Sequence, residues 1–210
     1  CLVVLFGNGR GTPAVAGAVT FGATVVATDA NTGASIGPAV TGVGVTAQTP
    51  AALTVSSFTA SRTTANVGQA VSFTLTLANG GGTTANVASV TPTVTPPASG
   101  SCSAVAPAGA QTIAGGASLP FSWTCTPSVA GAVTFGATVI ATDANTGASI
   151  GPAVAGVGVT AQTPAALTVS SFNASRTTAN VGQAVGFTLT LANGGGATAN
   201  TPDNERVDTS

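Results

Sequence analysis

The amino-acid sequence predicts an all-β protein composed of tandem antiparallel β-sandwich repeats. Short segments alternate apolar and polar residues with a period of two, and clusters of Gly, Asn and Pro separate them. Ala, Val and Thr dominate the composition, and β-branched side chains favour strands. Nowhere do apolar residues recur at helical spacing for three turns. One long segment also recurs almost unchanged, which indicates a repeat protein.

The repeat determines the organisation of the chain. Residues 15–86 recur as residues 129–200 at an offset of 114, and 67 of the 72 aligned positions are identical because the copies differ at five. This period exceeds a solenoid coil and matches a whole domain. We therefore expect each repeat unit to fold as one module.

The offset predicts one complete unit flanked by two partial units. Residues 15–50 are the C-terminal part of a preceding unit, residues 53–163 a complete unit, and residues 167–200 the N-terminal part of a following unit. Residues 1–14 form an atypical N-terminal segment and residues 201–210 an atypical tail. Out-of-frame translation is one hypothesis for residues 1–11 and 201–210, which depart from the repeat.

Period-two alternation predicts strands within the complete unit. We expect them at Leu53–Val55, Val71–Leu77, Phe121–Cys125, Val133–Val139 and Val157–Val159. The shared parity of the apolar side chains places them on the inner face. The predicted inward set is Val71, Phe73, Leu75, Leu77, Phe135 and Val139, with Ser72, Thr74 and Thr76 outward.

Turn signals separate these strands, at residues 79–82, 96–100, 114–116 and 143–147. The segment Asp143-Ala144-Asn145-Thr146-Gly147, repeated as residues 29–33, places oxygen atoms at alternate positions before a glycine, as calcium loops do. Only one carboxylate is present in each copy, so we predict a turn held by Asp and Asn side chains and no metal site.

The stretches LTVSSFTASRTTANVGQAVSFTLTLANGGG and GGASLPFSWTCTPSVAGAVTFGATVIAT resemble the CARDB-type and related repeat domains of bacterial surface proteins. The resemblance covers the complete unit from Leu53 to about Thr163. It implies an immunoglobulin-like sandwich in a secreted or surface-attached protein with spacer or adhesive roles. It carries no catalytic residue.

Cys102 and Cys125 both lie in the complete unit. In the extracellular setting that the resemblance implies, a disulfide between them would stabilise a module of low charge. The alternative is two buried free thiols. Cys1 has no counterpart in the repeat and receives no role.

Charge is nearly absent, with four Arg, no Lys and five acidic residues. Nucleic-acid binding requires clustered basic side chains, so we exclude it. The longest apolar run, Leu2 to Phe6, is far shorter than the roughly 20 residues that span a bilayer. It also lacks the features of a signal peptide, so we expect any export signal outside these residues. The repeats offer no His, Lys, Tyr or Glu for acid–base chemistry, so we expect no enzyme and no cofactor.

Three function classes remain open. A structural spacer or adhesin stalk, whose partners are the neighbouring repeats, fits near-identical tandem units. A module that binds glycans or other surface proteins would require exposed aromatic residues, and an accessory domain would require a catalytic domain elsewhere. The candidate sugar platform is Phe73, Phe121, Trp123 and Phe135, although such aromatics in apolar strands usually belong to the core. The sequon at Asn173 is Thr59 in the other copy, and chance explains it.

The partial units contain too few strands for a core of their own. We expect them to find cover by packing against each other, against the complete unit, or between molecules.

Overall fold

The computed structural model describes residues 10–96 and 99–200. Within these residues the chain forms thirteen strands and no helix, so the all-β prediction is confirmed. The strands make two sheets of a central sandwich and two separate two-stranded hairpins. Cys1, most of the predicted segment 1–14 and the predicted tail 201–210 lie outside the described residues.

The first sheet of the central sandwich has four strands. Their order is β3 (Leu53–Ala60), β5 (Val71–Asn79), β9 (Ser118–Pro127) and β7 (Gly100–Cys102), and every neighbouring pair is antiparallel. Apolar and polar residues alternate along β5, and its exposure follows the same period. One face of this sheet is therefore apolar.

The second sheet has five strands. Their order is β4 (Thr64–Asn66), β11 (Val157–Gln162), β10 (Gly131–Asp143), β6 (Ala85–Thr95) and β8 (Gln111–Ile113). The pairs are antiparallel except for β4 and β11, which run parallel. The long strand β10 thus lies at the centre of the sheet.

One hydrophobic core joins the two sheets. The rings of Phe73 on β5 and Phe135 on β10 lie 5.0 Å apart between their centroids, which places the apolar faces of the sheets against each other. The predicted inward set is confirmed, since all six residues are buried, while Ser72 and Thr74 are exposed and Thr76 is half-buried.

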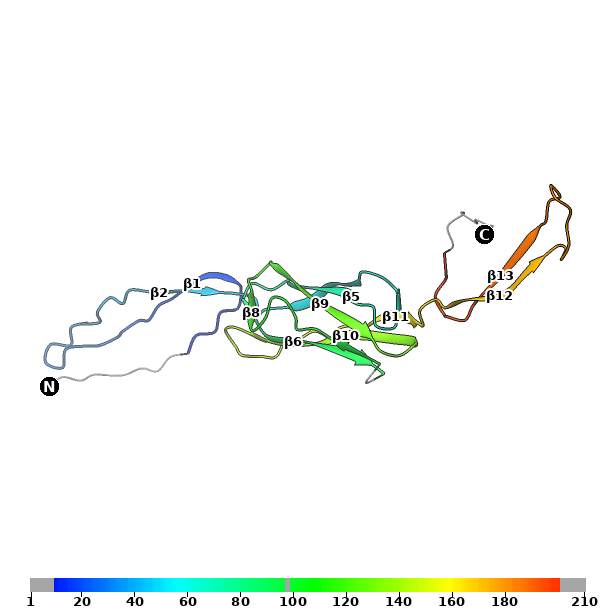
Figure 1. The fold of residues 1–210 in the computed structure, drawn as a ribbon. Coiled ribbons are helices and arrows are strands. Elements are labelled where there is room, and N and C mark those ends of the chain that lie inside the picture. The colour runs from blue at the N-terminus through cyan, green and yellow to red at the C-terminus, as the bar shows by residue number, and fades with distance from the viewer. Residues whose placement is uncertain (1–9, 97–98, 201–210) are drawn as a thin grey trace.

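The two hairpins extend from opposite ends of the central sandwich (Figure 1). The first pairs β1 (Gly17–Phe21) with β2 (Val43–Ala47), and the last pairs β12 (Leu167–Ala174) with β13 (Phe187–Asn193). The register of β1 and β2 is that of β10 and β11, displaced by the sequence offset of 114. Likewise, β12 and β13 pair as β3 and β5 do, including the same register shift. The two copies of each repeated segment therefore pair their strands in the same register, whether or not a second sheet covers them.

Candidate functional site at the linker before the central sandwich

Residues 48–52 connect β2 of the first hairpin to β3 of the central sandwich (Figure 1). A linker this short, between strands of two different sheets, controls how the hairpin and the sandwich are joined. Its backbone and side chains make hydrogen bonds to two turns of the central sandwich, the one after β5 and the one after β10. We therefore treat this linker and the turns that hold it as the candidate functional site.

Asp143, at the end of β10, holds the linker from one side. Its Oδ2 accepts a hydrogen bond of 2.6 Å from the Ala51 amide, and its Oδ1 accepts from the amides of Asn145 and Thr146 and from the Thr146 hydroxyl. The side chain is buried. The Ala51 amide lowers the pKa of Asp143 below its ordinary value of 3.8, although burial acts in the opposite direction. The linker is thus held by a buried carboxylate.

Asn79, at the end of β5, holds the linker from the other side. Its Oδ1 accepts from the amides of Ala52 and Gly81, both at 3.1 Å, and its Nδ2 donates to the carbonyls of Thr83 and Ile113. Only 1% of the side chain is exposed. All four hydrogen bonds of the amide are therefore made, as burial requires.

Thr49 adds the third attachment. Its carbonyl accepts from the amides of Gly82 and Thr83 and from the Thr83 hydroxyl, and its own hydroxyl accepts from the Gly82 amide at 2.8 Å. The side chain of Gln48 accepts from Asn145 and donates to the carbonyl of Gly82. The turn that follows β5 thus runs directly along the linker.

The glycines of this turn are required by close approach of the backbone. A Cβ on Gly81 would overlap the carbonyl oxygen of Pro50. A Cβ on Gly115, in the turn before β9, would overlap the carbonyl oxygens of Gly81 and Gly82. Three segments of main chain therefore meet here at distances that only glycine permits.

Part of the same network recurs at the second linker, residues 163–166, which joins β11 to β12. The Oδ1 of Asn193 accepts from the amides of Ala166 and Gly195, and Thr163 accepts from the amides of Gly196 and Ala197. The hydrogen bond from the Ala51 amide to Asp143 has no counterpart at the second linker among the described residues. The second linker therefore makes these hydrogen bonds to the end of β13 and its turn although no second sheet covers β12 and β13 among the described residues.

The predicted cysteine pair forms a disulfide in the structure. Cys102 on β7 and Cys125 on β9 are directly opposite each other in the sheet register. Cys125 is buried against the core, and the bond attaches the short edge strand β7 to its neighbour. The disulfide has a structural role in this sandwich.

The turn at residues 143–147 is stabilised by the side chain of Asp143, as predicted, whereas the side chain of Asn145, also expected to hold the turn, donates to Gln48 and Thr83 instead. Gly147 has a φ of 71° and donates its amide to the carbonyl of Asp143. Both carboxylate oxygens of Asp143 are occupied by N–H and O–H donors. Within the described part of the chain there is no group of three or more Cys, Asp or Glu residues that could hold a metal ion.

The candidate sugar platform is not available at the surface. Phe73, Phe121 and Phe135 are fully or almost fully buried, and 3% of Trp123 is exposed. Trp123 packs against Phe58 and Phe73, with ring centroids 5.5 and 6.2 Å away. The aromatic residues of this sandwich build its core. Asn173 of the sequon is exposed on β12.

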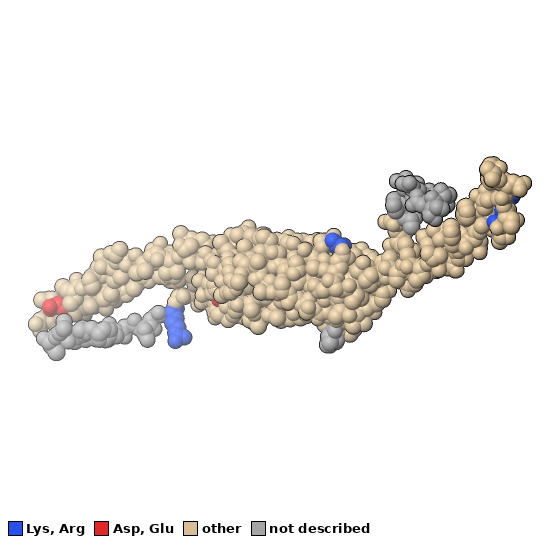
Figure 2. All heavy atoms as spheres, in the orientation of Figure 1, with Lys and Arg blue, Asp and Glu red and all other residues tan. Residues whose placement is uncertain are grey.

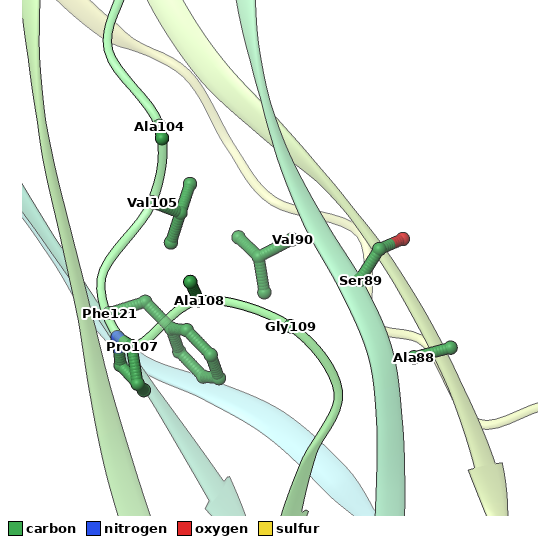
Figure 3. A pocket seen from close by; sticks show the side chains of 9 residues that line it. All are labelled: Ala88, Ser89, Val90, Ala104, Val105, Pro107, Ala108, Gly109 and Phe121. Atoms are coloured by element: carbon green, nitrogen blue, oxygen red, sulfur yellow. The ribbon is translucent and has the colours of Figure 1, made fainter.

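A shallow apolar pocket of about 200 Å³ lies beside β6 (Figure 3). Its lining is Ala88, Ser89, Val90, Ala104, Val105, Pro107, Ala108, Gly109 and Phe121. The lining holds no charged side chain and one hydroxyl group. It therefore supplies no acid or base, and the Ser89 hydroxyl has no base among the lining residues to activate it.

Figure 2 shows one face of the molecule on which charged side chains are few and far apart. The described residues include three arginines, Arg10, Arg62 and Arg176, and two aspartates, Asp29 and Asp143. No helix of these residues is long and apolar enough to cross a membrane. Within the described part of the chain, the charged side chains are too few and too scattered to steer a ligand.

No protein-family model and no curated protein matches the chain, so the resemblance to CARDB-type domains stays a prediction. Among solved structures, the chain is similar to the cupredoxin domain of amoB from Nitrosocaldus yellowstonii, at 13% identity over 52% of this chain and 86% of that chain, with a TM-score of 0.37. It is also similar to domains 4 and 5 of the S-layer protein SbsC, at 18% identity over 71% of this chain and 67% of that chain, with a TM-score of 0.34. Both TM-scores are low, so neither likeness supports a conclusion about this chain.

Proposed function

We propose that this chain is a non-enzymatic spacer, part of a stalk of a secreted or cell-surface protein. In this proposal, immunoglobulin-like sandwiches follow one another as tandem repeats, with residues 53–163 as one complete unit and residues 15–50 and 167–200 as parts of its neighbours. Hydrogen bonds hold the linkers between units, so neighbouring sandwiches keep a fixed orientation and the stalk stays extended.

The observation that carries the proposal is the attachment of the linker to both sheets of the sandwich. Asn79 belongs to the first sheet and Asp143 to the second, and the two hold consecutive amides, those of Ala52 and Ala51. The two linkers also leave the sandwich at opposite ends (Figure 1). A spacer needs this end-to-end arrangement, whereas a binding site does not.

The disulfide supports an extracellular location, because such bonds persist in oxidising compartments. The burial of Trp123 favours the spacer over the sugar-binding alternative, which depended on exposed aromatic residues. The near absence of titratable side chains supports the non-enzymatic part of the proposal.

Stiffness is tested by pulsed electron paramagnetic resonance between spin labels at Thr20 on β1 and Thr74 on β5, both exposed. Cys1→Ser removes the third cysteine of the chain, and the Cys102–Cys125 disulfide is kept oxidised. We expect one narrow distance distribution, which Asp143→Asn broadens. A broad distribution in the unaltered linker would show a flexible tether and would refute the stiff spacer.

Location is tested separately, with antibodies to residues 53–163 on intact and on permeabilised cells of the source organism. Labelling that requires permeabilisation would refute a surface location.

A further inference from the structure

The two hairpins at the ends of the structure each expose an apolar face. On the last hairpin, Phe187 is 46% exposed and Leu189 45% exposed, whereas their equivalents Phe73 and Leu75 are fully buried. On the first hairpin, Val45 is 45% exposed, and its equivalent Val159 is buried. Each hairpin is a separate two-stranded sheet among the described residues. Both faces therefore lack the cover that the same sequences have in the central sandwich.

The central sandwich shows what covers such faces. Strands β3 and β5, the equivalents of the last hairpin, share one core with β10 and β11, the equivalents of the first hairpin. The closest aromatic contact across this core joins Phe73 and Phe135. The residues equivalent to this pair are Phe187 on β13 and Phe21 on β1. Each hairpin thus carries the sequence that normally covers the other.

The polar groups are complementary in the same way. In the central sandwich, Asp143 Oδ2 accepts from the Ala51 amide. The equivalent of Asp143 is Asp29, whose Oδ1 accepts from the amides of Asn31 and Thr32, while its Oδ2 has no partner among the described residues. The equivalent of Ala51 is Ala165, whose amide likewise has no partner in the described part of the chain. One hairpin offers the acceptor and the other the donor.

We propose that the last hairpin of one copy docks on the first hairpin of a second copy, as β3 and β5 dock on β11 and β10. Because the hairpins leave opposite ends of the sandwich (Figure 1), the contact joins different molecules and repeats along a growing chain. Such a head-to-tail contact uses two different surfaces and forms open filaments unless it closes into a ring. The formal net charge of −1 opposes this association weakly.

Size-exclusion chromatography with light scattering tests the proposal, on the full chain with Cys1→Ser so that this cysteine forms no bond between chains. Val45→Lys blocks the first hairpin, and Leu189→Lys blocks the last. The matched controls, Thr46→Lys and Thr188→Lys, add the same charge next to these positions, and their equivalents Thr160 and Thr74 face solvent in the central sandwich. Fluorescence of Trp123, the one tryptophan, checks that the central core is intact.

We expect the mass of the Cys1→Ser chain to rise with concentration above the 19.6 kDa monomer. Both control variants should associate in the same way as the Cys1→Ser chain. Each blocked variant alone should stay monomeric. An equal mixture of the two should double in mass and go no further, since each supplies the face that the other lacks. Monomers at every concentration, or equal effects of Leu189→Lys and Thr188→Lys, would overturn the proposal. Dimers of Val45→Lys alone would also overturn it, because they require the last hairpin to pair with itself.

Discussion

The backbone amide of Ala51 donates a hydrogen bond of 2.6 Å to the carboxylate of Asp143, 92 positions later in the chain. This contact joins the start of the central sandwich to the end of its longest strand. It also ties the linker from the preceding hairpin to the second sheet.

Asp143→Asn should lower the Tm of the central sandwich by several degrees. The two carboxylate oxygens accept four N–H or O–H donors between them, and an amide would turn its NH₂ group toward at least one of those donors. Thermal unfolding followed by the fluorescence of Trp123 measures the change. Asp29→Asn, in the equivalent but exposed turn, is the control and should leave this transition in place. Equal shifts in the two variants would contradict the role of the Ala51 contact.

The stability of the central sandwich should fall in acid. The pKa of Asp143 is lowered in the folded state, first by the Ala51 amide, so the unfolded chain binds the proton more tightly. The stabilisation is therefore complete well above 3.8, the ordinary pKa, and is lost as the pH falls through the lower pKa of the folded protein. Urea unfolding between about pH 6 and pH 2 should show this loss, and Asp143→Asn should flatten the curve. A curve that is unchanged in the variant would exclude Asp143 as its source.

Gly81→Ala should destabilise the sandwich by about 1–3 kcal/mol, because the new Cβ overlaps the carbonyl oxygen of Pro50 and both groups belong to closely packed main chain. Gly80→Ala is a matched control in the same turn. Its Cβ would lie 3.8 Å from the nearest atom, the carbonyl oxygen of Ala52. Urea unfolding of the two variants compares the costs, and a Gly80→Ala cost as large as that of Gly81→Ala would contradict the close approach.

Reduction of the Cys102–Cys125 disulfide should cost about 3 kcal/mol, the loop-closure entropy for a separation of 23 residues. Urea midpoints with and without a reducing agent give the difference. The double variant Cys102→Ser/Cys125→Ser should unfold at the lower midpoint in both buffers. If the reducing agent leaves the midpoint of the native protein unchanged, the bond adds no stability to the sandwich.

Strand prediction succeeded where alternation is strict and both flanks are turns, as in β5. It failed for β6, which contains Pro92 and several small polar residues and which was not predicted as a strand. Pro92 is tolerated because β8 pairs only with Ala85–Val87, so at Pro92 the strand has β10 as its one neighbour. The short strands β4, β7 and β8 have three residues each, too few to show a period.

The linker site was largely missed for a different reason. Asn79 was interpreted only as the start of a turn, and the contact between Ala51 and Asp143 spans too much sequence for a local pattern to indicate it. The segment Gln-Thr-Pro-Ala-Ala occurs before both β3 and β12. Because almost every position of the repeat is identical, however, that recurrence does not distinguish the linker from the rest of the unit.

The central claim, that the linker is held by the sandwich that follows it, is tested most directly by amide hydrogen exchange at Ala51 and Ala165. Both amides lie in the same local sequence, and only that of Ala51 meets a buried carboxylate. The measurement uses the Leu189→Lys variant, so that association between chains does not cover Ala165. We expect Ala51 to exchange as slowly as the core of β5, and Ala165 to exchange at the rate of an unstructured chain. Asp143→Asn should then release Ala51. Equal, fast exchange at both amides would show that the linker is free and would contradict the account.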